Sequence, residues 1–164
     1  MIKNLTGRVW KFGDDINTDL LAPGGYMKCS LEELSSHCLE TVDSSFAGEV
    51  KNSDLIVAGK NFGVGSSREQ AAQVLSFLGV AAVIASSFGG IFYRNAFNWG
   101  LPAITCASVK GIENGHQLQV NLDTGTITNL DTSKTLNCEA IPDHLLDLIS
   151  VGGLVPYLEQ TLNK

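Results

Sequence analysis

Two serines and an arginine follow a glycine-rich turn in this sequence, where they could bind an anion. Gly63-Val64-Gly65 is followed at once by Ser66, Ser67 and Arg68. Glycines let the backbone approach a ligand closely, and a helix start offers free N–H groups at the positive end of the helix dipole. An arginine fork matches the two oxygens of a carboxylate. The turn therefore predicts a site for a small carboxylic acid.

Ser66 could take part in chemistry or could serve only to start a helix. Ser66-x-x-Glu69 has the spacing of a capping box, in which both side chains bond backbone N–H groups. As a proton acceptor, Ser66 would need its hydroxyl acidified by helix N–H groups and a nearby cation. Arg94, in an aromatic-rich helical stretch, could reach this turn or brace it by pairing with Glu69. The spacing alone leaves these interpretations open.

Several other chemistries are excluded at this turn. Arg68 stands where a dinucleotide-binding turn has its third glycine, and no Gly-Lys-Ser/Thr follows, as a phosphate-binding loop requires. No histidine is adjacent to Ser66 in the sequence, so a Ser-His-Asp hydrolase has no support. His37, His116 and His144 are expected at the surface or in packing. The four cysteines lack metal-ligand spacing and are expected to be small buried hydrophobes, so the chain is predicted to bind no metal.

Composition and charge narrow the class of protein. The 164 residues are 44% hydrophobic and 17% charged, which predicts one globular domain spanning residues 1–164. A net charge of -6 without a basic stripe excludes a general nucleic-acid binder. No apolar run reaches the roughly 20 residues that span a bilayer. The N-terminal residues 1–6 lack the apolar core of a signal peptide, so a cytoplasmic location is expected.

The elements that must position the turn are short strands that alternate with helices. Apolar and alternating runs predict strands at 7–12, 54–59, 81–85 and 103–106, and helices at 31–39, 67–78 and 92–99. This order predicts an α/β fold with a partly parallel sheet and flanking helices, whose ligands bind beyond the carboxyl ends of the strands. Three β segments within 116–141 predict a β-rich C-terminal addition. Helices are expected at 143–150 and 156–162.

Three blocks of the chain together resemble the swivelling domain of the aconitase superfamily. They are 13–19, 58–69, which contains Gly65-Ser66-Ser67-Arg68-Glu69, and 87–96. The resemblance covers nearly the whole chain and is greatest to the separate small subunits of 3-isopropylmalate dehydratase and homoaconitase. It implies a layered β/β/α swivelling domain. It also implies a hydro-lyase that is active only with a large subunit.

The resemblance further implies roles for individual residues. Ser66 would remove the carbon-bound proton, and Asp19 would lie near the reacting groups. Ser67 and Arg68 would bind a substrate carboxylate, and Tyr26-Met27-Lys28 stands where the family has its substrate-recognition loop. The large subunit would carry a [4Fe-4S] cluster whose open iron binds the leaving hydroxyl. This chain would bind no cofactor itself.

The expected reaction converts 2-isopropylmalate to 3-isopropylmalate in leucine biosynthesis, but two features of the chain keep the substrate open. Gln70-Ala71-Ala72 replaces the His-Ala-Pro of many relatives and favours homoaconitase-like members, whereas homoaconitate-type loops tend to have an arginine near Lys28. Met27 could cover an isopropyl branch, and Lys28 could meet a third carboxylate. The alternatives are a homoaconitase or a dehydratase of methyl-branched malates, such as 2,3-dimethylmalate or citramalate. A non-catalytic anion-binding domain is the alternative from another class.

Overall fold

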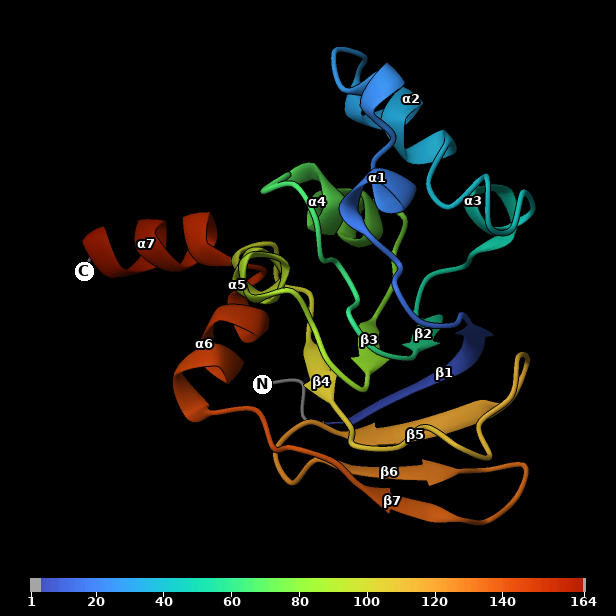
Figure 1. The fold of residues 1–164 in the computed structure, drawn as a ribbon. Helices are drawn as coiled ribbons and strands as arrows, with labels where there is room; N and C mark the ends of the chain where they lie inside the picture. The colour runs from blue at the N-terminus through green and yellow to red at the C-terminus, as the bar shows by residue number, and fades with distance from the viewer. Residues whose placement is uncertain (1–3, 164) are drawn as a thin grey trace.

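One seven-stranded sheet organises this computed structural model, which describes residues 4–163. The strand order is β4-β3-β2-β1-β5-β6-β7 (Figure 1). The strands are β1 (Asn4–Lys11), β2 (Leu55–Ala58), β3 (Ala82–Ala85), β4 (Ala103–Thr105), β5 (Gln117–Asn121), β6 (Thr126–Asn129) and β7 (Thr135–Asn137). The helices are α1 (Thr18–Leu21), α2 (Leu31–Ser36), α3 (Phe46–Glu49), α4 (Gln70–Phe77), α5 (Gly90–Asn98), α6 (Asp143–Val151) and α7 (Leu154–Leu162), with a 3-10 turn η1 (Gly24–Tyr26).

The first half of the sheet is parallel, as the alternation of strands and helices predicted. β1 pairs with β2, β2 with β3, and β3 with β4, all in parallel. Every residue of β2 and β3 is buried, which explains why these strands are continuous apolar runs without a polar face. The α/β class is thereby confirmed.

The second half of the sheet is antiparallel and forms the predicted β-rich addition. β5 pairs with β1, β6 with β5, and β7 with β6. In β5, Leu118 and Val120 are buried while Gln117 and Gln119 are exposed, so one face of this half packs on the core and the other faces solvent. In Figure 1 these strands lie on the side of the molecule opposite α1–α4.

The two edges of the sheet meet, because the chain after β7 returns to the end of β4. Cys106 follows β4, Cys138 follows β7, and the two form a disulfide. Beside it, the Glu139 N–H donates to the Thr105 carbonyl oxygen at 2.9 Å. The sheet therefore curls toward a barrel. The expectation that all four cysteines are no more than small buried hydrophobes is wrong for this pair, since spacing along the chain does not reveal which edges of the sheet meet.

The other two cysteines differ from each other. Cys38 is buried, as expected, and this burial raises the pKa of its thiol. Cys29 is exposed, so the expectation is wrong for it.

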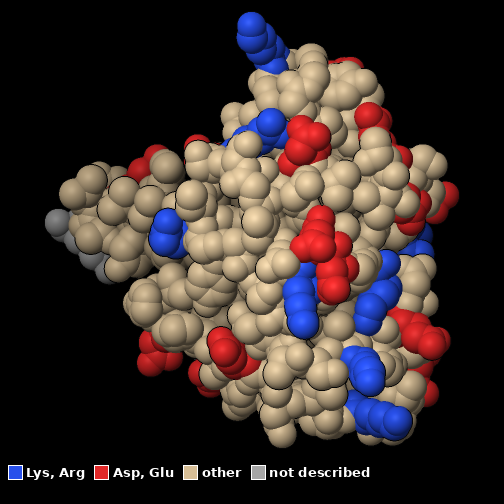
Figure 2. Space-filling model, in the orientation of Figure 1, with Lys and Arg blue, Asp and Glu red and all other residues tan. Residues whose placement is uncertain are grey.

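The distribution of charged side chains on the surface agrees with the absence of a basic stripe in the sequence. On the face drawn in Figure 2, Lys and Arg side chains lie among Asp and Glu side chains. Within the described part of the chain, no helix is long and apolar enough to cross a membrane.

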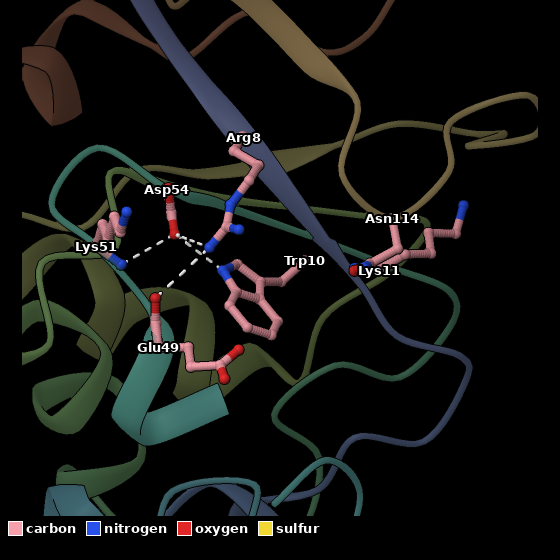
Figure 3. Close-up of polar contacts among 7 residues, drawn as sticks. All are labelled: Arg8, Trp10, Lys11, Glu49, Lys51, Asp54 and Asn114. Carbon is pink, nitrogen blue, oxygen red and sulfur yellow. Dashed lines mark hydrogen bonds and ion pairs between the residues drawn. The ribbon is translucent and has the colours of Figure 1, made fainter. Parts of the chain in front are cut away.

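A buried carboxylate joins β1 to the start of β2 (Figure 3). One oxygen of Asp54, Oδ2, accepts hydrogen bonds from Trp10 Nε1 at 2.9 Å, the Lys51 N–H at 2.9 Å and Arg8 Nη2 at 3.2 Å. The Arg8 guanidinium also lies 5.0 Å from the centre of the Trp10 ring. Asp54 is 5% exposed, so its charge depends on these donors for compensation.

We predict that Asp54→Ala lowers the free energy of unfolding by about 2–4 kcal/mol, because it leaves buried donors without an acceptor. Chemical denaturation measures this change. Asp147→Ala, at an exposed position on α6, is the matched control and should stay within about 0.5 kcal/mol of the unaltered chain. Equal effects of the two substitutions would contradict the assigned role of Asp54.

Candidate active site

Three loops meet beyond the carboxyl ends of β1, β2 and β3. Each leads from its strand toward a helix: 12–17 toward α1, 59–69 toward α4, and 86–89 toward α5. The middle loop exchanges backbone hydrogen bonds with the other two: Gly63 N–H to Ile16 O at 2.7 Å, Thr18 N–H to Val64 O at 3.0 Å, Phe62 N–H to Ser87 O at 3.0 Å, and Gly89 N–H to Phe62 O at 2.8 Å. The three sequence blocks that carried the resemblance therefore form one structural unit.

Two glycines allow this close approach. Gly63 has a φ of +77°, and a Cβ at this position would collide with the Phe92 ring. Gly65 has a φ of +127°, and a Cβ there would lie 2.9 Å from Thr18 Oγ1. Residues other than glycine rarely adopt these backbone angles. The turn can therefore press against both neighbouring loops only because these positions lack side chains.

Polar side chains reinforce the contact between the loops. The Lys60 N–H donates to Asp14 Oδ1 at 2.7 Å, and Asn61 Nδ2 donates to Asp15 Oδ1 at 2.8 Å. The Asn61 N–H donates to Ser87 Oγ at 2.8 Å. The first loop thus holds residues 60–61, which lead into the glycine-rich turn, through the carboxylates of Asp14 and Asp15. The side chain of Lys60 itself is exposed to solvent.

The capping box that the Ser66-x-x-Glu69 spacing allowed does not form among the described residues. Helix α4 begins at Gln70 with Glu69 as its N-cap and without a side-chain capping bond. Ahead of it, the chain makes a tight turn in which the Arg68 N–H donates to Ser66 O at 2.8 Å. Because the helix starts later than predicted, Ser66 and Ser67 lie exposed before it. The N–H groups of Ser67, Glu69 and Gln70 donate to no other residue that the structure describes.

Arg68 and Asp19 are in direct contact. Arg68 Nη1 donates to Asp19 Oδ1 at 2.7 Å and to the Ala22 carbonyl oxygen at 3.0 Å. Asp19 Oδ1 also accepts from the Gly24 N–H at 3.0 Å. The bond from Arg68, followed by that from Gly24, lowers the pKa of Asp19 below its usual value. Of the described residues, none accepts a hydrogen bond from Arg68 Nη2 or Nε, so these donors can meet a ligand.

The predicted recognition loop follows directly on this contact. Its residue Tyr26 stacks on the ring of His37, with ring centroids 3.6 Å apart and planes at 6°. Met27 is half-buried and packs against the core, whereas Lys28 is exposed. In the described part of the chain, neither makes a hydrogen bond or ion pair with the serine turn, Ser66–Arg68.

His37 was expected only at the surface or in packing. Its pairing with two carboxylates was not predicted. The local signal for this pairing is a glutamate on each side at helical spacing, Glu33 four residues before and Glu40 three residues after.

Arg94 does not brace the turn. It is exposed on α5 and lines a surface hollow together with His144, Leu145 and Leu148 of α6. Within residues 4–163 it makes no ion pair with Glu69, so the bracing interpretation is wrong. The turn is braced instead by the contact of Arg68 with Asp19. In the same range, no group of three or more His, Cys, Asp or Glu side chains could hold a metal ion.

Comparison with known proteins identifies the class to which this arrangement belongs. The family described as the aconitase C-terminal domain matches residues 16–108, which is more than half of the chain. A crystal structure of 3-isopropylmalate dehydratase from Methanocaldococcus jannaschii has a TM-score of 0.91 and 42% identity, covering 97% of this chain and 95% of that one. The fold and the three-loop site thus define a swivelling domain of the aconitase type.

Curated relatives show to which family of aconitase-type proteins the chain belongs. The chain is 48% identical over 158 residues to the 3-isopropylmalate dehydratase small subunit 1 of Thermotoga maritima, covering 95% of each. It is 44% identical over 160 residues to the isopropylmalate/citramalate isomerase small subunit of Methanocaldococcus jannaschii, covering 96% of this chain and 95% of that protein. The chain belongs to the family of 3-isopropylmalate dehydratase small subunits, a hydro-lyase family related to aconitase. The resemblance seen in the sequence is confirmed.

We predict that Gly63→Ala destabilises the fold by about 2 kcal/mol or more, since it adds backbone strain and a collision with the Phe92 ring. Denaturant unfolding measures the loss. Gly90→Ala at the start of α5 is the control, because a Cβ there meets no atom within 4 Å. A Gly63→Ala variant as stable as the control would mean that the loops do not pack as described.

We also predict that Arg68→Gln raises the pKa of Asp19, because the charged donor that stabilises the carboxylate is removed. In the unaltered chain, the pair contributes stability above the ordinary pKa of an aspartate, and loses it as the pH falls through the lowered value. Carboxyl carbon NMR titration follows Asp19 directly. An unchanged Asp19 midpoint in the variant would show that the two side chains are not paired in solution.

Proposed function

We propose that this chain supplies half of the active site of a 3-isopropylmalate dehydratase. The enzyme would interconvert 2-isopropylmalate and 3-isopropylmalate through an alkene. The observation that carries the proposal is the serine turn, Ser66–Arg68, which leaves hydroxyls, N–H groups and part of a guanidinium without protein partners among the described residues. These donors suit an anionic substrate. The names of the relatives supply the substrate class.

In this proposal, Ser66 is the base. Its oxygen, as an alkoxide, takes the proton from the carbon next to the one that bears the hydroxyl, and the electron pair of that C–H bond becomes the alkene as the hydroxyl leaves. Rehydration returns the proton and the hydroxyl to exchanged carbons, so no net water is consumed. The N–H donors of the turn and the Arg68 charge would lower the energy of the alkoxide.

The remaining residues of the site would bind and orient the substrate. Ser67 and the free nitrogens of Arg68 would hold one carboxylate, and Asp19 keeps the guanidinium aligned for it through the 2.7 Å contact. Tyr26, Met27 and Lys28 would line the part of the pocket that distinguishes the side group of the malate. Lys28 is exposed and could meet a third carboxylate of the substrate.

We further propose that a large subunit completes the site. The relatives are named small subunits, and the described residues offer no ligand set for a metal. A [4Fe-4S] cluster held by the large subunit would act as the Lewis acid for the leaving hydroxyl. This chain then forms one domain, residues 1–164, of a cytoplasmic pair.

The substrate could extend beyond isopropylmalate, since one relative is named an isopropylmalate/citramalate isomerase. The test is a kinetic panel with the reconstituted pair, comparing 2-isopropylmalate, citramalate, 2,3-dimethylmalate and homocitrate-series acids. The highest kcat/KM is expected for 2-isopropylmalate. A preference for homocitrate-series acids would assign the pair to homoaconitase, and an absence of turnover with every acid would favour a non-catalytic anion-binding domain.

We predict that Ser66→Ala, reconstituted with the large subunit, lowers kcat by roughly 10²- to 10⁴-fold, the range that a positioned proton acceptor contributes. Steady-state kinetics measure the loss, and size-exclusion chromatography verifies that the pair still assembles. Ser44→Ala, at an exposed position outside the three loops, is the control and should retain full turnover. Unchanged turnover in Ser66→Ala would show that Ser66 is not the base.

A further inference from the structure

The recognition loop Tyr26-Met27-Lys28 lies within a longer loop, residues 22–29, whose first half is attached to the site. The Gly24 N–H donates to Asp19 Oδ1 at 3.0 Å, and Arg68 donates to the Ala22 carbonyl oxygen at 3.0 Å. A Cβ on Gly24 would lie 3.3 Å from both Arg68 Nη2 and Asp19 Oδ1, so this part of the loop is directly against the arginine. The position of the loop and the direction of the guanidinium therefore depend on each other.

The second half of the loop is held in a different way. Its hydrogen bonds are local, such as that from the Cys29 N–H to Tyr26 O at 3.0 Å. Within the described residues, no hydrogen bond orients the Tyr26 hydroxyl. The ring instead lies parallel to the His37 ring, with centroids 3.6 Å apart, and its remaining packing against the core is non-directional. The stack on His37 therefore sets the direction of the Tyr26 side chain.

His37 is itself held rigidly. Its Nδ1 lies 2.6 Å from Glu40 Oε2, and its Nε2 lies 3.3 Å from Glu33 Oε1. Both contacts can be hydrogen bonds only when both ring nitrogens carry protons, that is, in the imidazolium form. A cationic ring over the face of Tyr26 also gains a cation–π attraction. Ser30 begins the helix that carries Glu33 by accepting a hydrogen bond from the Glu33 N–H at 3.1 Å.

The charge on His37 depends on few groups. Glu40, followed by Glu33, raises the pKa of His37. Two helices pack against α2. Helix α4 has no titratable side chain in Gln70–Phe77, and the titratable side chain of α3 is that of Glu49, whose backbone carbonyl oxygen accepts from Arg8. Among the described residues, the phenol of Tyr26 is a further titratable group in contact with the ring. The imidazolium is therefore present at low pH and is lost as the pH rises through the raised value.

We propose that His37 is a positioning residue that fixes Tyr26, and with it the recognition loop, in the orientation that binds the substrate's side group. The inference rests on the proposed function, because it assumes that this loop contacts a malate-like acid. His37 does not touch the serine turn, so it would act on substrate binding and on discrimination between side groups. It would not act on proton removal.

The experiment measures kcat and KM for 2-isopropylmalate and citramalate, across a pH series, with the large subunit present. His37→Ala should raise KM for 2-isopropylmalate by roughly 3- to 10-fold, the scale of an aromatic or cation–π stack. Its kcat should stay within about 2-fold, and its preference over citramalate should fall. His37→Phe keeps a ring for the stack, so it should restore much of the affinity. His144→Ala, at an exposed position on α6, is the control.

The pH series separates positioning from general damage to the fold. In the unaltered pair, KM should rise as the pH passes through the raised pKa of His37, and His37→Phe should abolish this rise. Glu40→Gln removes the main carboxylate partner, so the rise in KM should move to lower pH. This variant keeps the test valid if His37→Ala fails to fold.

Two outcomes would overturn the inference alone, and a third would overturn the proposed function as well. An unchanged KM in His37→Ala, whatever happens to kcat, rejects the positioning role while the unaltered pair remains active. An unshifted pH profile in Glu40→Gln rejects it as well. If the unaltered pair turns over none of the acids, the proposed function fails, and the inference fails with it.

Discussion

The contact between the backbone of the 62–64 segment and the two loops beside it is the constraint on which the site depends. Gly63 donates to the first loop at 2.7 Å, and Gly89 in the third loop donates back to Phe62 at 2.8 Å. Three parallel strands end at this edge, so their loops are brought together without any side chain having to span the gap. The absence of side chains at Gly63 and Gly65 is what lets these hydrogen bonds form. Every donor of the serine turn is placed by them.

At this edge, Asp19 orients the Arg68 guanidinium but leaves some of its hydrogen-bond donors free for a ligand. Asp19 and the Ala22 carbonyl occupy one nitrogen of Arg68, which leaves its other donors for a ligand. The contact with Ala22 also ties the 22–29 loop, which contains the recognition loop, to the serine turn. A substrate that draws Arg68 toward its carboxylate would therefore also act on the loop. On the far side of the loop, the stack of Tyr26 on His37 provides a second, independent restraint.

The rest of the molecule keeps this edge in place. At the other end of the strands, the buried Asp54 gathers Arg8, Trp10 and the Lys51 backbone around one oxygen (Figure 3). The antiparallel half extends the sheet until its last strand returns to the first edge at Cys106. A sheet with both ends anchored resists the splaying that would separate the three loops.

The sequence by itself determined the order of the strands and of the helices α2 and α4–α7, the glycine-rich turn and the family, because these follow from local hydrophobic patterns and from blocks of adjacent residues. It did not predict the short helices α1 and α3. The helix after the turn was predicted three residues too early, since a capping pattern describes preferences of the chain and not the turn that forms. Only the tertiary structure decided which side chains meet: Arg68 with Asp19, Tyr26 with His37, and Cys106 with Cys138. The first and third pairs are 49 and 32 residues apart. Such contacts depend on which strands and loops become neighbours, and the packing of the whole sheet determines that.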